Sequence, residues 1–283
     1  MPVGRHRTSI SKRRGKLIMT FIAAMDNSGG SAGGVLDTYG QPWTEEDKME
    51  KIHAFRMRMI NSDCFDSKNI DSAILYKDSI ERGAVPALKA KGIRAILKID
   101  NGTEESGLLK EFDDTAMIEY AVEHGCYGTK MRSIIHNVGL IDKVLDQQFK
   151  LAEKIHSYGL MPIVEPEVDI NNPNKSIIED ILKDSLLKRL NSMKGKCILK
   201  LTLPDVPNTY MSLLNVQSLE RLVGLSGGYS TEQACLRLSL NRNMQASFSR
   251  ALSEGLFYND EDDYFETAIS KNINIIVDAS QKG

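Results

Sequence analysis

The chain has 283 residues, enough for one large α/β barrel or two smaller domains, each with a substantial core. Its 36 basic and 38 acidic residues give a formal net charge of −2, so nothing points to nucleic acid or an anionic membrane as a partner. The apolar runs are too short to span a bilayer, and the 4 cysteines show no CxxC spacing, so we expect a cytoplasmic protein with reduced thiols.

The amino-terminal segment is basic, and no acid occurs before Asp26. Organellar transit sequences share this bias, but the first apolar run already begins at Leu17. We therefore expect residues 1–16 to form a mobile basic arm. Because no linker rich in Pro and Gly divides the rest, we expect residues 17–283 to form a single domain.

Short apolar runs then alternate with segments of helical period. Eight runs predict β-strands, at residues 17–25, 73–76, 93–99, 126–131, 160–168, 197–203, 222–225 and 245–248. Helical stripes lie between several of them, at Met49, Ile52, Arg56, Met59 and Ile60, at Leu145, Phe149, Ala152 and Ile155, and at Ile178, Ile181, Leu182 and Ser185. Ser230 and Gln233 have the spacing of a capping box, and residues 264–277 predict a closing helix. Eight strands, each followed by a helix, predict a single (β/α)8 TIM barrel of the α/β class.

Most of the reactive side chains lie at or just after the carboxyl ends of the predicted strands. They are Asp26, Lys98, Asp100, Lys130, Arg132, Glu165, Glu167, Lys200, Ser226 and Arg250. The carboxyl ends of barrel strands meet at one mouth, where barrel enzymes carry their active sites. We therefore expect these side chains to share one site.

Three lysines, Lys98, Lys130 and Lys200, each end a short strand-like run. A lysine at such a position is usually only a solvated residue. Desolvation or a neighbouring cation, however, lowers the pKa of a lysine toward the nucleophilic free amine, which forms Schiff bases with carbonyl substrates. The repetition favours this chemistry.

Two carboxylates, Glu165 and Glu167, stand two residues apart on one strand and project to the same side. Paired carboxylates push their pKa values apart, which suits proton transfer near neutral pH. Structural ion pairs with Lys130 or Arg132 would equally account for the two acids. The sequence leaves both interpretations open.

Two glycine turns indicate anion binding. Residues 226–230 follow the seventh predicted strand and lead into a helix, and residues 26–31 follow the first; each turn can offer backbone N–H groups to a phosphate. Two phosphate positions indicate a bisphosphorylated substrate. Neither turn is a Walker or GxGxxG motif, so we expect no cofactor. No histidine ends a strand, and no HxH or HExxH spacing occurs, so we expect no metal site.

Six segments in chain order resemble class I fructose-bisphosphate aldolases, in particular the short bacterial form. They are residues 21–31 (FIAAMDNSGGS), 128–133 (GTKMRS), 162–167 (PIVEPE), 199–202 (LKLT), 225–230 (LSGGYS) and 246–252 (ASFSRAL). The resemblance implies a Schiff-base (β/α)8 barrel that acts in glycolysis and gluconeogenesis. Its implied partner is a small sugar bisphosphate, without nucleic acid or membrane, and a homo-oligomer is possible.

The resemblance also implies roles for single residues. Lys200 would attack the keto carbon of fructose 1,6-bisphosphate, Glu165 would act as acid and base, Asp26 would take the proton from the hydroxyl on carbon 4, and Lys130 would be a fixed cation beside Lys200. Ligands of the ketone-half phosphate would be Ser226, Gly227 and Arg250, and those of the other phosphate would be Ser28, Ser31, Lys98 and Arg132. Glu167 would orient Lys130 or Lys200.

The chain departs from the longer animal-type members at three places. Those members flank the nucleophile with Glu-Gly and Pro-Asn, whereas here Lys200 stands between Leu199 and Leu201, which favours the short subfamily. They also end in a tyrosine that assists enamine protonation, while this chain has no tyrosine after Tyr264. Asn27 replaces an acid beside the catalytic aspartate.

Three other functions compete with this one. A tagatose-bisphosphate aldolase or a transaldolase-like enzyme would use the same lysine on another sugar phosphate. A non-catalytic barrel binding protein would not need Lys200, Glu165 and Asp26. A metal-dependent aldolase is disfavoured by the histidine positions.

Overall fold

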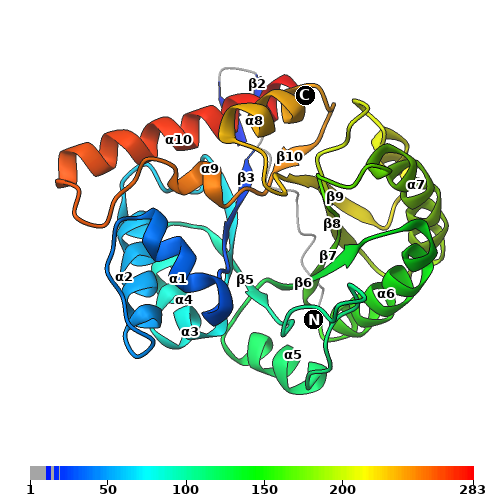
Figure 1. Cartoon of the computed structure of the whole chain (residues 1–283), viewed down its shortest axis with the longest axis horizontal. Helices are drawn as coiled ribbons and strands as arrows, with labels where there is room; N and C mark the ends of the chain where they lie inside the picture. Colours follow the sequence, from blue (N-terminus) through cyan, green and yellow to red (C-terminus); the bar gives the residue numbers. More distant parts are fainter. Residues whose placement is uncertain (1–10, 14–15, 19) are drawn as a thin grey trace.

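The computed structural model describes residues 11–13, 16–18 and 20–283, with side chains described from Thr20 onward except at residues 29–31. Eight parallel strands form a nearly closed barrel (Figure 1). They are β3 (Phe21–Met25), β4 (Ile70–Leu75), β5 (Arg94–Lys98), β6 (Gly128–Ile135), β7 (Met161–Val168), β8 (Cys197–Thr202), β9 (Leu219–Leu225) and β10 (Gln245–Ala246). Between β10 and β3 the Ala24 amide donates to the Phe248 carbonyl at 3.2 Å. The predicted TIM barrel is therefore confirmed.

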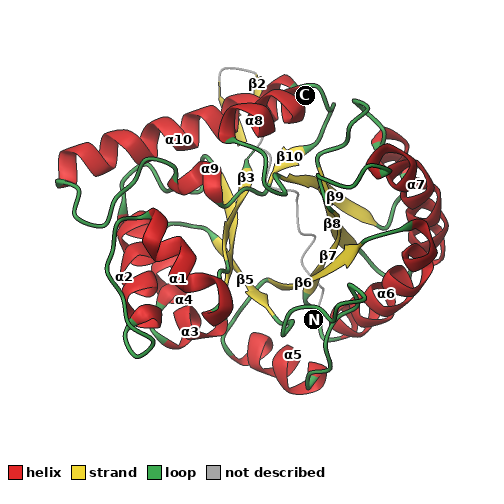
Figure 2. Cartoon of the chain, in the orientation of Figure 1, coloured by secondary structure: helices red, strands yellow, loops and turns green. Residues whose placement is uncertain are grey.

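Helices surround this ring of strands (Figure 2). They are α1 (Gly29–Thr38), α2 (Lys48–Asn61), α3 (Lys77–Glu81), α4 (Ala84–Ala90), α5 (Asp114–Glu123), α6 (Ile141–Ser157), α7 (Lys175–Ser192), α8 (Thr231–Ser239), α9 (Arg250–Ser253) and α10 (Asp262–Lys282), with 3-10 turns η1 (Val138–Leu140) and η2 (Met211–Asn215). The closing helix predicted at residues 264–277 is α10. Among the described residues, no helix is long and apolar enough to cross a membrane.

Most of the predicted helical stripes face the barrel. On α6, Leu145, Ala152 and Ile155 are fully buried, as expected. On α7 the expected stripe is wrong at Ile181, which is 42% exposed. The buried row of α7 runs through Ile178, Leu182 and Leu186 instead, because positions four apart on a helix share a face.

The first barrel strand begins later than the apolar run suggests. Leu17 pairs with Lys12 in a separate antiparallel ladder of β1 (Ser11–Arg13) and β2 (Lys16–Ile18). The predicted start of the first barrel strand at Leu17 is therefore wrong, and the strand starts at Phe21. The rest of the expected basic arm, residues 1–10 and 14–15, lies outside the described residues.

The barrel interior is layered. One apolar layer fills its middle with a side chain from almost every strand: Ile22, Ala24, Ile74, Ile96, Ile163, Ile198 and Val223, with Tyr127 and Met161 packed against it. Inward positions recur every second residue along a strand. The next inward layer toward the carboxyl ends therefore lies on an apolar floor and faces the mouth.

Candidate active site

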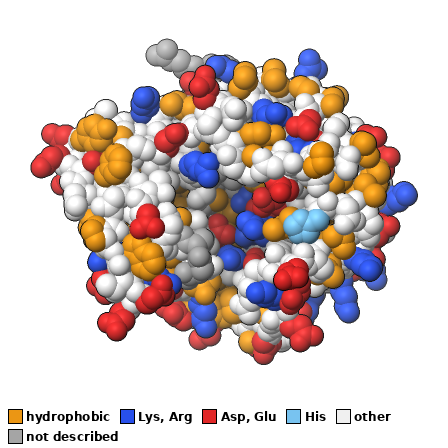
Figure 3. Space-filling view, viewed as in Figure 1, with side chains coloured by type: hydrophobic (Ala, Val, Ile, Leu, Met, Phe, Trp, Pro, Cys, Tyr) orange, Lys and Arg blue, Asp and Glu red, His pale blue; other side chains and the backbone are white. Residues whose placement is uncertain are grey.

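A cavity of about 850 Å³ opens at the carboxyl ends of the strands. Its lining includes Asp26, Ser28, Lys98, Lys130, Arg132, Glu165, Glu167, Lys200, Ser226, Gly227 and Arg250. Every site residue predicted from the sequence is therefore in one cavity, except Ser31, whose side chain lies outside those described. In the space-filling view, acidic and basic side chains gather around the hollow at the centre of this face (Figure 3).

One inward residue from each strand forms the innermost ring of the mouth. Each lies two positions, or one inward step, beyond an interior residue of its strand, and all eight line the cavity: Asp26, Tyr76, Lys98, Lys130, Glu165, Lys200, Leu225 and Ser247. The second inward step beyond this ring brings Ser28, Asp100, Arg132, Glu167, Gly227 and Ser249 to the cavity wall. The sequence motifs thus converge because they occupy equivalent strand positions.

Lys130 is the centre of a buried charge cluster. Its Nζ lies 2.8 Å from Asp26 Oδ2, 3.2 Å from Glu165 Oε2 and 3.8 Å from Asp100 Oδ2. The other oxygen of Glu165, Oε1, lies 3.1 Å from Lys200 Nζ. Glu165 therefore bridges the two lysines, and Asp26 joins the cluster from the far side of the barrel.

The cluster fixes the charge states of two members. Burial alone would raise the pKa of Asp26, but the positive charges of Lys130 and Lys200 and the hydrogen bond from Lys130 hold that pKa well below its ordinary value. Burial alone would lower the pKa of Lys130, but the carboxylates of Asp26, Glu165 and Asp100 raise it well above the ordinary value. At neutral pH Asp26 is an anion and Lys130 a cation.

The backbone of Glu165 is held by a buried side chain from α6. Gln148, which has no exposed surface, donates to the Glu165 carbonyl at 3.2 Å and accepts from the Glu165 amide at 2.9 Å. These two bonds fix the peptide groups on either side of Glu165, whose carboxylate lines the mouth. Apart from the ion pair with Lys130, Glu165 Oε2 accepts no hydrogen bond within the described part of the chain, so it can still accept one from a bound hydroxyl.

Asp100 contacts Lys98 and the neighbouring strand β6. Its Oδ1 accepts from the Gly102 amide at 3.0 Å and lies 3.7 Å from Lys98 Nζ, while its Oδ2 accepts from the Arg132 amide at 3.2 Å. Lys98 Nζ also lies 3.3 Å from Ser28 Oγ and 5.9 Å from the centre of the Tyr76 ring. The Lys98 ammonium is thus fixed at the wall next to the turn after β3.

Glu167 pairs with Arg132, one of the two partners that the residues alone suggested, and not with a lysine, as the resemblance implied. Its Oε2 lies 3.5 Å from Arg132 Nε, and it forms no ion pair with Lys130 or Lys200, so the expectation that it orients one of these lysines is wrong. The reason is geometric, because Glu167 and Arg132 belong to the outer layer of the mouth, one inward step beyond Glu165 and Lys130. Burial raises the pKa of Glu167, and Arg132 partly offsets this rise.

The turn after β9 is shaped for an anion. Gly227 and Gly228 have φ values of 57° and 115°, which favour glycine, and a Cβ on Gly227 would come within 2.9 Å of Ile170. Helix α8 follows directly, and its Ser230–Gln233 capping box is present as predicted. Arg250, exposed at the start of α9, donates to the Gly228 carbonyl at 3.2 Å. A glycine turn that leads into a helix N-terminus and a guanidinium therefore lie together at the cavity wall.

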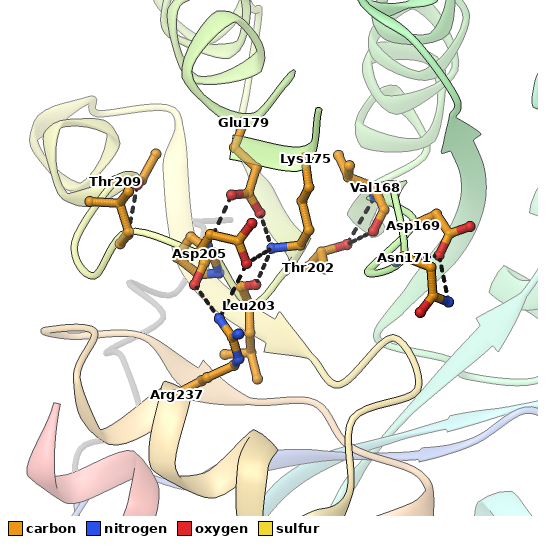
Figure 4. A network of polar contacts seen from close by, with 12 residues as sticks. Val168, Asp169, Asn171, Lys175, Glu179, Thr202, Leu203, Asp205, Thr209 and Arg237 are labelled. Atoms are coloured by element: carbon orange, nitrogen blue, oxygen red, sulfur yellow. Dashed lines mark hydrogen bonds and ion pairs between the residues drawn. The ribbon is translucent and has the colours of Figure 1, made fainter. Parts of the chain in front are cut away.

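A buried ion network lies behind this turn (Figure 4). Lys175 Nζ lies 2.6 Å from Glu179 Oε1 and 3.1 Å from Asp205 Oδ1, and it donates to the Leu203 carbonyl at 2.9 Å. Arg237 of α8 lies 3.3 Å from the same Asp205 oxygen and stacks 4.3 Å from the centre of the Tyr229 ring. The network ties the segments after β7 and β8 to the anion turn.

Three residues of the innermost ring were missed from the sequence, Tyr76, Leu225 and Ser247. Ser247 is 2% exposed, its Oγ has no hydrogen-bond partner among the described residues, and it lines the cavity beside β3. The only sequence signal for any of the three is its position two places after an interior residue. The described residues contain no group of three His, Cys, Asp or Glu side chains arranged to hold a metal ion.

No protein-family model matches the chain. Relatives named fructose-bisphosphate aldolase class 1 nevertheless match nearly all of it. The Synechocystis sp. protein is 40% identical over 92% of this chain and 93% of its own. Those of Porphyromonas gingivalis and Clostridium acetobutylicum are 39% and 37% identical over 93% and 96% of this chain, and 95% and 97% of their own.

Solved structures share the architecture. The fructose-bisphosphate aldolase of Plasmodium falciparum superposes with a TM-score of 0.76, covering 93% of this chain and 90% of its own, at 18% identity. An archaeal fructose 1,6-bisphosphate aldolase gives a TM-score of 0.57 over 92% of this chain and 94% of its own, at 12% identity. At these identities the likeness concerns the barrel fold.

Proposed function

The chain belongs to the class I fructose-bisphosphate aldolase family and is a carbon–carbon lyase, and we propose that it cleaves fructose 1,6-bisphosphate through a Schiff base on Lys200. One observation carries this proposal. Glu165 touches both lysines of the mouth, 3.1 Å from Lys200 Nζ and 3.2 Å from Lys130 Nζ. A nucleophile, an acid–base group and a fixed cation therefore lie next to one another on three neighbouring strands, β8, β7 and β6.

The first stage forms the imine. Lys200 gives a proton to Glu165 and attacks carbon 2 of the open-chain sugar, which forms a carbinolamine. Glu165 returns a proton to the departing hydroxyl, so water leaves and a protonated imine remains. The apolar layer beneath Lys200, which includes Ile163 and Ile198, closes the barrel below the amine, so the reaction is open to solvent only through the mouth.

The second stage breaks the carbon–carbon bond. Asp26, held as an anion, takes the proton from the hydroxyl on carbon 4. The electron pair of the bond between carbons 3 and 4 moves toward the imine, glyceraldehyde 3-phosphate leaves, and an enamine remains. Lys130, 2.8 Å from Asp26, stabilises the negative charge that develops on the carbon-4 oxygen as its proton leaves.

The last stage releases dihydroxyacetone phosphate. The enamine gains a proton at carbon 3, Asp26 releases the proton that it took from the hydroxyl on carbon 4, and the protonated imine forms again. Water, activated by Glu165, then adds to carbon 2 and frees Lys200. Ser247, whose buried hydroxyl has no hydrogen-bond partner among the described residues, lines the cavity, and we assign it to the ketone half of the substrate, because a buried hydroxyl without a partner is costly.

Two anion sites hold the ends of the substrate. Ser226, Gly227 and Arg250 bind the phosphate of the ketone half at the turn before α8. Ser28, Lys98 and Arg132 bind the other phosphate across the mouth, and Ser31 of α1 is assigned to the same site. Glu167 fixes the Arg132 guanidinium rather than taking part in proton transfer. The reaction belongs to glycolysis and gluconeogenesis, and we place it in the cytoplasm.

A coupled assay tests this function. The purified protein is supplied with fructose 1,6-bisphosphate, and dihydroxyacetone phosphate is measured as it forms. We expect turnover that persists in EDTA, loss of turnover in Lys200→Ala, and full turnover in Lys196→Met, a half-exposed lysine just before β8. Tagatose 1,6-bisphosphate is the second substrate arm. Turnover lost on chelation, retained in Lys200→Ala, or faster with the tagatose ester would contradict the proposal.

A further inference from the structure

Helix α2 carries a charged residue within its apolar stripe. Arg56 is only 2% exposed and lies among Ile52, Phe55 and Met59, all of which are buried. Its guanidinium donates to the Asn27 carbonyl and, at 2.8 Å, to Ser79 Oγ. Arg56 therefore joins the turn directly after Asp26 to helix α3, which follows the mouth residue Tyr76.

The guanidinium is buried without an ion-pair partner. Within the described part of the chain, no carboxylate forms an ion pair with Arg56, and the ionisable groups that interact with it electrostatically are Asp26, Tyr39, Asp78 and His53. Burial lowers the pKa of Arg56 to about 10, with Asp26 opposing this shift, so the side chain stays a cation at neutral pH. An unpaired buried charge destabilises a fold, which makes a merely structural use of this arginine costly.

The surroundings of the Arg56 cation give it a function. Its hydrogen bond to the Asn27 carbonyl fixes the peptide next to Asp26, and its electrostatic interaction with Asp26 is mutual. We propose that Arg56 is a positioning residue for Asp26: it fixes the turn that carries this carboxylate and places a permanent positive charge behind it. The proposal rests on the assignment of Asp26 as the base of the cleavage step.

Two groups of cations therefore face Asp26. Lys130, Lys200 and Lys98 act from the cavity side, on β6, β8 and β5, and Arg56 acts from α2 behind the turn. Because cations lower the pKa of a carboxyl, removal of any one of them raises it. The acid limb of kcat/KM, which reports ionisation of the free enzyme's base, should therefore move to higher pH without Arg56.

The same helix offers a matched control. Arg58, two residues further along α2, also donates to backbone carbonyls, those of Tyr258 at 2.9 Å and Asp260 at 2.5 Å, and stacks 4.1 Å from the centre of the Phe265 ring. It also pairs with Asp262, 3.0 Å away, and within the described part of the chain it makes no contact with residues 26–28. Arg58→Met thus removes an arginine with backbone hydrogen bonds from the same helix but leaves Asp26 unchanged.

The experiment compares Arg56→Met, Arg56→Lys and Arg58→Met. For each, kcat and kcat/KM are measured for cleavage over a pH series, and borohydride trapping of dihydroxyacetone phosphate measures imine formation, which does not need Asp26. We expect Arg56→Met to lower kcat by about 10- to 100-fold and to move the acid limb of kcat/KM to higher pH. The amount of dihydroxyacetone phosphate that this variant traps should stay within about twofold of the amount trapped by the unaltered enzyme. Arg56→Lys should lose part of kcat and keep the acid limb, and Arg58→Met should change neither.

Several outcomes would overturn the role of Arg56. They are an unchanged kcat and acid limb in Arg56→Met, or an equal shift of both in Arg58→Met. Should Arg56→Met fail to fold, Arg56→Lys decides, because an unchanged kcat or a displaced acid limb in that variant contradicts the role. If the unaltered enzyme traps no dihydroxyacetone phosphate, the Schiff-base function fails, and this role fails with it.

Discussion

Among single residues, Lys130 has the most demanding position. It is 2% exposed and faces three carboxylates, from Asp26, Glu165 and Asp100. Burying charges is favourable only when they are paired and hydrogen-bonded. The mouth meets this condition by matching three acids with three lysines, so each charge depends on its neighbours.

Loss of Lys130 tests this dependence. In Lys130→Met, burial of Asp26 is no longer offset by its nearest cation, so the pKa of Asp26 rises. We expect the acid limb of kcat/KM to move to higher pH and kcat to fall by about 10²- to 10³-fold. Lys130→Arg retains the charge and should leave the acid limb closer to that of the unaltered enzyme. An acid limb that stays in place in Lys130→Met would contradict the assignment of Asp26 as the base.

Gln148 offers a test on the other side of the cluster. Replacement by Leu leaves the buried amide and carbonyl of Glu165 without their partners, which costs about 1–3 kcal/mol for each group. We expect Gln148→Leu to lower the free energy of unfolding and also kcat, because the Glu165 carboxylate loses its fixed backbone. Chemical denaturation and steady-state kinetics measure both. A variant with lower stability but normal kcat would show that Gln148 does not position Glu165.

Charged residues of the site could be predicted from the sequence, because a charge at the end of a buried strand is costly unless a partner or a substrate offsets its burial. Tyr76 and Ser247 could not be predicted, since an aromatic ring or a hydroxyl group at such a position is also common in a protein core. The lysine partner that the resemblance implied for Glu167 was wrong for another reason, although the residues alone had also suggested Arg132. Alternation along β7 gives the side of the strand on which Glu167 lies but does not decide between partners on that side, and the nearest cation is Arg132, with its Nε 3.5 Å from Glu167 Oε2.

On the scale of elements, the network of Lys175, Glu179, Asp205 and Arg237 connects three segments at the carboxyl side of the barrel (Figure 4). Lys175 and Glu179 begin α7, Asp205 follows β8, and Arg237 belongs to α8. Their bonds fix the loops on both sides of the strand that carries Lys200. The sequence did not reveal this network, because its members lie far apart in the chain.

Breaking the buried pair tests the strength of this network. Lys175→Met leaves the Glu179 carboxylate, 1% exposed, without its cation, and we expect a loss of about 3–5 kcal/mol in the free energy of unfolding. The double variant Lys175→Met, Glu179→Met removes both charges and should recover part of that loss. Lys196→Met, which breaks the more exposed pair with Glu220, should cost less than about 1 kcal/mol. Equal losses in Lys175→Met and Lys196→Met would contradict a buried network.

For the whole molecule, the alternation of apolar runs and helical stripes was sufficient to predict the barrel. The runs are short, buried on both faces and separated by helices. Few folds other than a parallel barrel can bury eight such strands on both faces. The predicted start of β3 was wrong because Leu17 and Ile18 belong to the same apolar run in the sequence, although they pair in the β1–β2 ladder. The error at Ile181 has a similar origin, since an apolar residue is not always buried.

Covalent trapping tests the central claim most directly. The unaltered protein is incubated with dihydroxyacetone phosphate, reduced with borohydride and digested, and the modified peptide is identified by mass spectrometry. We predict a single added mass, equal to the reduced imine, on the peptide that contains Lys200, and none in Lys200→Ala. An adduct on Lys98 or Lys130 in the unaltered protein, or no adduct at all, would contradict a Schiff base on Lys200.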